Sequence, residues 1–474
     1  MWVPRQASAR LAVSLCLTAV FAFAATVAHG QAYSVLYNFG SNSGGGDPEQ
    51  PSYSGIVAQG RDGNLYTTAQ SAGGAAGAVF KITPSGALTE LFKFDGPHGS
   101  TPNGGLTLGS DGNFYGTTGA GGVCCGVVFK ITPSGAITVL YKFSGGSDGG
   151  SPVAPPIQGW DGSFYGTTTS GIGAAFGTIY KITSSGKFKT IYRFTDSSKG
   201  AYPFAPLVQG TDGNFYGTTN SGGAGRGTIF KITPGGRLTV LFNFDGGRGT
   251  GPTAPLIQGS DGYFYGTAAT GGPGNVGTLF KMGSDGTFLV LHNFSFAADG
   301  GYLYGGIVES PDGDFYGATH AGALGFGSLY KVTPGGVLTA LYNFDDTTGA
   351  EADVTLVLHT TGVLYGDTSR GGTGNVSPCA TNACGVFYGL SNGLAATARL
   401  VPKAAKIGKT IGILGQGFTG TTAVSFNGTP ATTFKVVSST FLTAKVPPGA
   451  TTGYVTVTSP GGTLSSNQQF VVIP

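Results

Sequence analysis

The phrase Phe-Tyr-Gly-Thr-Thr, or a close variant of it, returns at a nearly fixed interval along the chain. Its tyrosine occurs seven times, in steps of 49 to 51 residues, at Tyr66, Tyr115, Tyr165, Tyr216, Tyr265, Tyr316 and Tyr365. An interval of this length can hold one four-stranded sheet, and a regular interval indicates a propeller or a solenoid. We therefore expect seven copies of one sheet-forming unit.

The composition fits a body built of β-sheets. Only 10% of the 474 residues are charged, whereas 88 are Gly and 12% are aromatic, which favours turns and packed sheets over solvated helices. The formal charge is +3, and Arg5 and Arg10 near the N-terminus contribute two of these charges. We expect no basic surface for nucleic acid.

Residues 1–30 have the pattern of an export signal peptide. Arg5 and Arg10 precede an apolar run over residues 11–28, and small residues follow. The alternative is an uncleaved membrane anchor, because the run approaches the length that spans a bilayer. We expect a secreted, extracellular or periplasmic protein without a membrane span after signal removal.

The fourth copy shows how one unit is built. Strand-forming segments at 205–210 and 214–219 flank the turn Asp212-Gly213, and those at 227–232 and 238–244 flank a Thr-Pro-Gly-Gly turn. Asp-Gly and Pro-Gly pairs favour tight turns between antiparallel strands. Each copy is therefore predicted to hold four short antiparallel strands.

The two ends of the array complement one another. Residues 33–39 match fourth-strand segments such as 338–344, while the seventh copy stops at Leu394 without a fourth strand of its own. A ring closed by the N-terminal strand would remove the open sheet edges of a linear array. The predicted fold of residues 33–394 is all-β, a seven-bladed β-propeller closed by an N-terminal strand.

The repeat also resembles a known family. The stretch from Asp212 to Gly236, Asp-Gly-Asn-Phe-Tyr-Gly-Thr-Thr followed by Gly-Thr-Ile-Phe-Lys-Ile-Thr-Pro-Gly-Gly, is similar to the GloVer-type tandem repeat of secreted bacterial proteins. The resemblance covers residues 33–394. It implies an exported protein and supplies no catalytic residues and no cofactor.

Residues 399–474 form a second unit, a small immunoglobulin-like β-sandwich of short strands between Gly and Pro turns. The segments Gly415-Gln416-Gly417-Phe418, Val424 to Gly428 and Gly453 to Val457 resemble an IPT/TIG domain. The resemblance implies a spacer or a binding module.

Four cysteines follow the leader, in two pairs. Export favours a disulfide between Cys379 and Cys384, with two free thiols as the alternative. Cys124 and Cys125 are adjacent, and they form either a vicinal disulfide or two thiols. No His lies near enough in sequence to suggest that these cysteines bind a metal.

Two connections in each copy vary while the two tight turns stay alike, so the varied connections are expected to share one rim and to build the ligand site. Each loop that leads to the next copy carries a carboxylate: Asp47, Asp95, Asp148, Asp196, Asp245, Asp299 and Asp345. A ring of seven could bind cations or hydroxyl-rich ligands. The alternative is that Asp is simply favoured in Gly-rich loops.

The remaining polar residues suggest no catalytic or metal site. The five histidines are scattered, and no nucleophile, metal or paired-carboxylate spacing can be defended. The first hypothesis is a secreted or cell-surface binding protein for a glycan or surface polymer. The alternatives are an extracellular carbohydrate-active enzyme, either a polysaccharide lyase or a glycosidase, and a structural surface protein.

Overall fold

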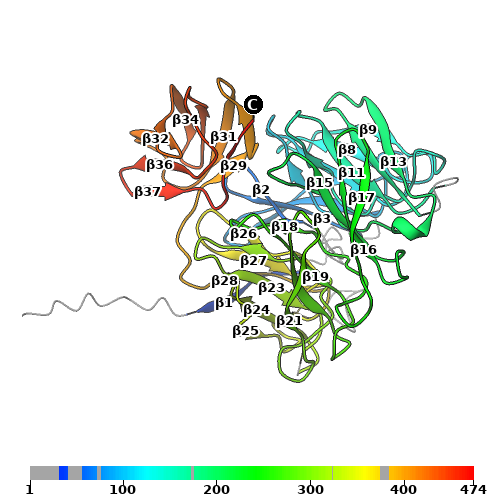
Figure 1. Ribbon diagram of the computed structural model, residues 1–474. Coiled ribbons are helices and arrows are strands. Elements are labelled where there is room, and N and C mark those ends of the chain that lie inside the picture. The colour runs from blue at the N-terminus through cyan, green and yellow to red at the C-terminus, as the bar shows by residue number, and fades with distance from the viewer. Residues whose placement is uncertain are drawn as a thin grey trace, which may run out of the picture.

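The computed structural model describes residues 31–40, 56–71, 76–171, 176–322, 324–373 and 384–473. Apart from the short 3-10 helix η1 (Ser197–Lys199), the regular structure of these residues consists of β-strands. Figure 1 shows a large array of sheets and a smaller orange-to-red unit beside it. None of the described residues forms a helix long and apolar enough to cross a membrane. The predicted leader lies outside the described residues.

Seven four-stranded antiparallel sheets make up the array, one for each copy of the sequence motif, and we number them repeats 1–7 in chain order. Repeats 1–3 comprise β2 (Ala58–Gln59), β3 (Leu65–Ala69), β4 (Ala78–Ile82), β5 (Leu88–Lys93); β6 (Thr107–Leu108), β7 (Phe114–Thr118), β8 (Val127–Ile131), β9 (Ile137–Lys142); β10 (Ile157–Gln158), β11 (Phe164–Thr168), β12 (Thr178–Ile182) and β13 (Phe188–Arg193). Repeats 4–6 comprise β14 (Val208–Gln209), β15 (Phe215–Thr219), β16 (Thr228–Ile232), β17 (Leu238–Asn243); β18 (Ile257–Gln258), β19 (Phe264–Ala268), β20 (Thr278–Met282), β21 (Phe288–Asn293); β22 (Val308–Glu309), β23 (Phe315–Thr319), β24 (Ser328–Val332) and β25 (Leu338–Asn343). Repeat 7 comprises β26 (Val357–Leu358), β27 (Leu364–Asp367), β28 (Val386–Ser391) and β1 (Ala32–Asn38).

The predicted four-stranded unit is confirmed, but the first strand of each repeat is much shorter than expected. In repeat 4 the segment predicted over residues 205–210 pairs regularly only at β14 (Val208–Gln209). Pro206 has no N–H to donate to a sheet ladder, which keeps the preceding residues out of regular pairing.

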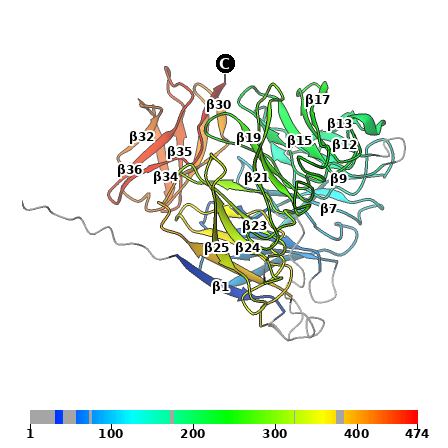
Figure 2. The ribbon, with the colours of Figure 1, turned by 60° about the horizontal axis from the view of Figure 1, so that its bottom comes forward.

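The N-terminal strand completes the last sheet, as predicted. β1 pairs antiparallel with β28 from Ala32↔Ser391 to Asn38↔Val386, and the blue β1 lies with the last repeats in Figures 1 and 2. Repeat 1 also contacts both of its neighbours directly, because Ile56 forms parallel bridges to Gly105 of repeat 2 and to Thr355 of repeat 7.

The recurring Phe-Tyr motif packs successive repeats together. The tyrosine ring of one repeat stacks on the phenylalanine ring of the next, with centroids 3.7 to 4.2 Å apart, in Tyr66–Phe114, Tyr115–Phe164, Tyr165–Phe215, Tyr216–Phe264 and Tyr265–Phe315. Leu364 and Leu65 take the place of the phenylalanine in repeats 7 and 1, where they join the clusters around Tyr316 and Tyr365. The motif therefore forms an interface between sheets.

The C-terminal unit is a β-sandwich around a core of its own. One sheet has the strand order β29 (Arg399–Val401), β31 (Thr410–Leu414), β35 (Phe441–Lys445), β34 (Phe434–Ser438); the other has β33 (Thr429–Pro430), β32 (Ala423–Phe426), β36 (Val455–Ser459), β37 (Gly462–Ser465); and β30 (Ala404–Lys406) pairs in parallel with β38 (Val471–Ile473). This agrees with the predicted sandwich.

Candidate functional site

The two varied connections of the repeats lie against one another. The loop that leaves one repeat bridges the loop between the second and third strands of the next, as in Ser100↔Ala120, Gly150↔Ser170, Ala201↔Ser221, Thr250↔Thr270, Gly301↔Ala321 and Ala350↔Arg370. This places both kinds of loop on one side of the array, where the sequence predicted a shared rim.

The rim carboxylates, however, are engaged inside their own loops. Each of the six that are described accepts a backbone N–H from a residue two to four positions away: Asp95 from His98, Asp148 from Ser144, Asp196 from Ser198, Asp245 from Arg248, Asp299 from Ser295 and Asp345 from Thr348. Asp47 lies outside the described residues. These contacts match the role of Asp in capping turns. The presence of Asp at these six positions is therefore explained by the turns alone, and no ligand is needed to explain it.

Among the described residues, none of these six carboxylates belongs to a group of three donors close enough to share a cation. Hydrogen bonds from within the loop lower the pKa of Asp95, and they also lower that of Asp345. Asp95 and Asp345 are therefore anchored and ionised, and the role of the rim as a ligand site stays a prediction.

The cysteine predictions have separate outcomes. Cys124 and Cys125 are joined in a disulfide between neighbouring residues, in the loop between the second and third strands of repeat 2, so the bridged alternative holds there. Cys384 is buried directly before β28. Its predicted partner Cys379 lies outside the described residues, and that pairing stays a prediction.

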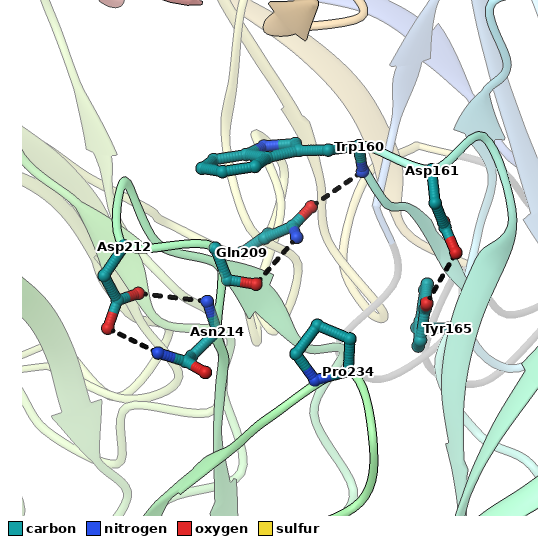
Figure 3. Close-up of a pocket in the computed structure, with 8 residues that line it drawn as sticks. Trp160, Asp161, Tyr165, Gln209, Asp212, Asn214 and Pro234 are labelled. Atoms are coloured by element: carbon teal, nitrogen blue, oxygen red, sulfur yellow. Dashed lines mark hydrogen bonds between the residues drawn. The ribbon is translucent and has the colours of Figure 1, made fainter. Parts of the chain in front are cut away.

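A groove lies on the opposite side, where the tight turns of repeats 3 and 4 meet. It encloses about 310 Å³ and is lined by Trp160, Asp161, Tyr165, Gln209, Asp212, Gly213, Asn214 and Pro234. Figure 3 shows the indole of Trp160 lying across the groove above Gln209, with Asp212 and Asn214 on one side and Asp161 and Tyr165 on the other. We call this the Trp160 groove.

Gln209 holds the two walls of the groove together. Its Oε1 accepts the backbone N–H of Trp160 at 2.9 Å, and its Nε2 donates to the carbonyl of Gly213 at 2.9 Å. Gly213 has a φ of +81°, and a Cβ there would lie 3.2 Å from the ring carbon Cζ3 of Trp160. Glycine thus suits the tight turn and leaves room for the indole.

The two carboxylates of the groove are held in fixed positions. Asp212 accepts from the Asn214 side chain at 2.8 Å and from the Tyr216 hydroxyl at 2.8 Å, while Asp161 pairs with Lys181 at 2.6 Å. Partial burial would raise the pKa of Asp212, but these hydrogen bonds outweigh it and lower the pKa overall. The groove therefore presents ionised carboxylates beside an aromatic ring.

The C-terminal sandwich occupies part of the same side of the array. Thr440 donates to the carbonyl of Arg61 at 2.7 Å, and the Arg61 guanidinium lies 4.4 Å from the ring centre of Phe441. Gln416 donates to Thr360 Oγ1 at 2.8 Å. These contacts involve the first tight turns of repeats 1 and 7, whereas the Trp160 groove lies at those of repeats 3 and 4.

Sequence reasoning missed the Trp160 groove, although one signal was present. Trp160 precedes the Asp-Gly turn of repeat 3, at a position held by Arg61, Ser110, Thr211 and Ser260 in other repeats. It is also the one tryptophan outside the predicted leader. A unique aromatic residue on an otherwise repeated turn is the sequence signal that could have pointed to this groove.

Comparison with known families matches both parts of the chain. A family model described as the Gloeobacter/Verrucomicrobia repeat matches residues 19–178 and 157–379, and an IPT/TIG domain model matches residues 397–472. The search of curated proteins finds no significant match.

Solved structures with a similar arrangement have low identity to this chain. A gluconolactonase from Xanthomonas campestris has 14% identity and a TM-score of 0.39, with 61% of this chain and 86% of that chain covered. The luciferin-regenerating enzyme has 13% identity and a TM-score of 0.40, with 77% and 97% covered. A protein of unknown function from Dyadobacter fermentans has 10% identity and a TM-score of 0.42, with 77% and 99% covered. No inference about function rests on these likenesses.

Proposed function

The chain belongs to the Gloeobacter/Verrucomicrobia repeat family, and from this premise we propose that it is an exported binding protein that holds a glycan in the Trp160 groove. The observation that carries the proposal is the half-buried indole of Trp160 lying across a groove lined with carboxylates and amides. Aromatic rings offer a flat apolar surface, while fixed polar groups give a small ligand its orientation.

The dimensions of the groove suit a small portion of a polymer. A volume of about 310 Å³ is at the lower end of the range for ligand pockets, which fits one or two sugar units. Sugar hydroxyls donate hydrogen bonds, and the carboxylates of Asp161 and Asp212 are acceptors. A second unique aromatic residue, Tyr263, is 41% exposed at the corresponding turn of repeat 5, so a longer chain could contact both rings.

The scaffold in this proposal is a closed seven-bladed propeller. Closure is supported by the pairing of β1 with β28 and by the bridge between Ile56 and Thr355. It is also supported by Gln59, which donates to Thr360 Oγ1 at 2.7 Å across the junction of repeats 1 and 7. In such a ring the walls of the groove would be held rigidly, because each wall belongs to a sheet that packs against a neighbouring sheet on both of its faces.

The experiment is a glycan array with the purified full-length protein, followed by titration of a retained glycan under tryptophan fluorescence. Trp160 is one of two tryptophans in the sequence, and the other, Trp2, lies in the predicted leader. Binding should change the emission in the wild type and leave it unchanged in Trp160→Phe. Trp160→Ala should weaken binding roughly thirtyfold, the effect of losing about 2 kcal/mol of contact.

Phe296→Ala is the matched control, since Phe296 is a 43% exposed aromatic residue in the loop after repeat 5, on the rim side. Binding retained in Phe296→Ala and lost in Trp160→Ala supports the proposal. The reverse result would transfer the site to the rim. Cleavage of the retained glycan, seen as new reducing ends, would replace a binding protein with an enzyme.

A further inference from the structure

A cluster of metal-binding residue types lies between repeats 6 and 7, on the rim side. His320 follows β23, and Glu351 and Asp353 lie in the segment that leads to β26. One donor atom from each of the three residues lies within 4.8 Å of the other two. His320 Nδ1 is 2.8 Å from Asp353 Oδ1, so the carboxylate already orients the imidazole ring.

A fourth carboxylate, Asp367, lies beside this cluster without a hydrogen-bond partner on Oδ1. It is 1% exposed. Continuing the antiparallel register from the pair Val357↔Tyr365 places residue 355 opposite Asp367 and residue 353 opposite Ser369. The contact of Ser369 Oγ with Asp353 Oδ2 at 3.4 Å agrees with this register. Asp367 itself lies on β27 two residues after Tyr365 and therefore shares the face of that tyrosine. This is the face from which the equivalent Thr117 contacts the next repeat, and Asp367 is not among the three grouped donors.

The grouped residues already form ion pairs within the protein. Arg370 pairs with Glu351 at 3.0 Å, and His320 pairs with Asp353 at 2.8 Å. Asp353 is almost fully buried, and a buried carboxylate is costly to keep ionised. A divalent cation held by His320, Glu351 and Asp353 together would offset that cost.

The other repeats show that the fold does not require these residues. The position of Asp353 is held by Asn103, Val153, Phe204, Thr253 and Tyr304, and that of Asp367 by Thr68, Thr117, Thr167, Thr218, Thr267 and Ala318. In the regular repeats the threonine serves the junction of two sheets, as when Thr117 Oγ1 donates to the carbonyl of Ala154 at 3.0 Å. Asp367 replaces a donor of this kind by an acceptor.

We propose that His320, Glu351 and Asp353 bind a divalent cation that accepts mixed nitrogen and oxygen ligands, as Zn²⁺ and Mn²⁺ do. Two donors that each lie about 2.0–2.2 Å from one ion are at most roughly 4.4 Å apart, so the three grouped donors need only a small contraction. A histidine ligand favours such an ion over Ca²⁺ and Mg²⁺, which prefer all-oxygen sites. The second ring nitrogen of His320 stays available to a neighbour.

The test uses the full-length protein after dialysis against EDTA and then against metal-free buffer. Calorimetric titration with Zn²⁺ should show one site, and Ca²⁺ should bind at least tenfold more weakly. Substitution with Co²⁺ should give visible absorption bands that report directly on the ligands. His320→Gln and Asp353→Asn should each weaken Zn²⁺ binding at least tenfold and change the Co²⁺ spectrum.

His98→Gln is the matched control, because His98 also contacts an aspartate, Asp95, at 2.8 Å but on the exposed rim. Its Zn²⁺ binding should equal that of the wild type. Equal binding in His98→Gln and His320→Gln, or no binding by the wild type at 100-fold excess of metal, would overturn the proposal. Glu351→Gln guards against a folding defect in Asp353→Asn: near-UV circular dichroism shows which variant is folded, and a folded Glu351→Gln with undiminished Zn²⁺ affinity also counts against the site.

Discussion

The substitution Gln59→Ala tests whether the junction of repeats 1 and 7 holds the array together. Gln59 is 1% exposed. Its Nε2 donates to Thr360 Oγ1 at 2.7 Å, and its Oε1 accepts the backbone N–H of Thr360 at 3.2 Å. Alanine removes both hydrogen bonds and leaves the N–H of Thr360, a residue that is itself 1% exposed, without a partner.

The cost can be worked from these contacts. An unpaired buried N–H costs about 1–3 kcal/mol and the second lost bond adds about 1 kcal/mol, so the free energy of unfolding should fall by about 3 kcal/mol. For a cooperative unit of roughly 360 residues, an unfolding entropy of about 2.1 cal/mol/K per residue converts this into a decrease in Tm of about 4 °C. Circular dichroism at two scan rates measures the decrease and detects irreversible unfolding.

Gln158→Ala supplies the comparison, because Gln158 makes the same kind of contact at an internal junction. Its Oε1 accepts the N–H of Ser110 of repeat 2 at 2.8 Å, but this bond is exposed to solvent. Water replaces an exposed bond at little cost, so its Tm should fall by about 1 °C or less. An equal or larger decrease in Gln158→Ala would refute the reasoning that the 1–7 junction closes and stabilises a ring.

Three further predictions concern packing, pH and the disulfide. Phe215→Ala should lower the free energy of unfolding by about 3–5 kcal/mol and Phe215→Leu by about 1–2 kcal/mol. Leucine keeps most of the volume facing Tyr165 but loses the contact between the two rings, whose centroids are 4.1 Å apart. Urea unfolding measures both free energies, and equal losses in the two variants would contradict the stacking role. The pKa of Asp212 is lowered in the folded protein, so its stabilisation is fully present above its ordinary value of 3.8 and is lost as the pH falls through the folded value; Asp212→Asn should flatten the acid side of the pH–stability curve, and an unchanged acid side would count against the lowered pKa. Thiol titration of the denatured, unreduced protein should detect no reactive thiol at Cys124 and Cys125, which are bonded in the structure, and labelling of both would contradict that bond.

The repeat architecture could be predicted because its signals are local. Asp-Gly and Pro-Gly turns and the spacing of the tyrosines identify four strands per copy, and the match of residues 33–39 to other fourth strands identifies the partner of β28. In the C-terminal unit, β35 (Phe441–Lys445) follows β34 after only two residues, Ser439 and Thr440. Such a short polar connection is a weak local signal for a strand boundary.

The candidate sites could not be predicted because they arise between repeats. Trp160 and Gln209 are 49 residues apart in sequence and meet only when the sheets of repeats 3 and 4 pack together. His320 and Asp353 are 33 residues apart in sequence and meet where the sheets of repeats 6 and 7 pack together. Variation between the copies pointed to the rim loops, because whole loops differ there in length and sequence. In each of these two sites, by contrast, only a few side chains differ from those of the other copies, and the backbone is the same.

Repeat 7 departs from the shared pattern more than the others, and its departures have two different causes. At its first tight turn Thr361 replaces the usual Asp, and Gly362 cannot carry a side chain because a Cβ would lie 2.2 Å from the carbonyl oxygen of Leu394. The chain that leads to the C-terminal sandwich passes this turn, which accounts for the replacement of Asp by Thr361, while the glycine is shared by every copy.

The same explanation does not extend to the buried carboxylates of repeat 7. The strand β1 pairs with the outer edge of β28, and the C-terminal sandwich contacts the tight-turn side at Thr360. Asp353 and Asp367 lie at the other end of the strands, next to the rim loops. Threonine at the position of Asp367 would supply the junction contact seen at Thr117 without burying a charge. The two buried carboxylates therefore differ: Asp353 shares a donor cluster with His320 and Glu351, so the proposed cation accounts for its burial, whereas nothing in the structure explains Asp367.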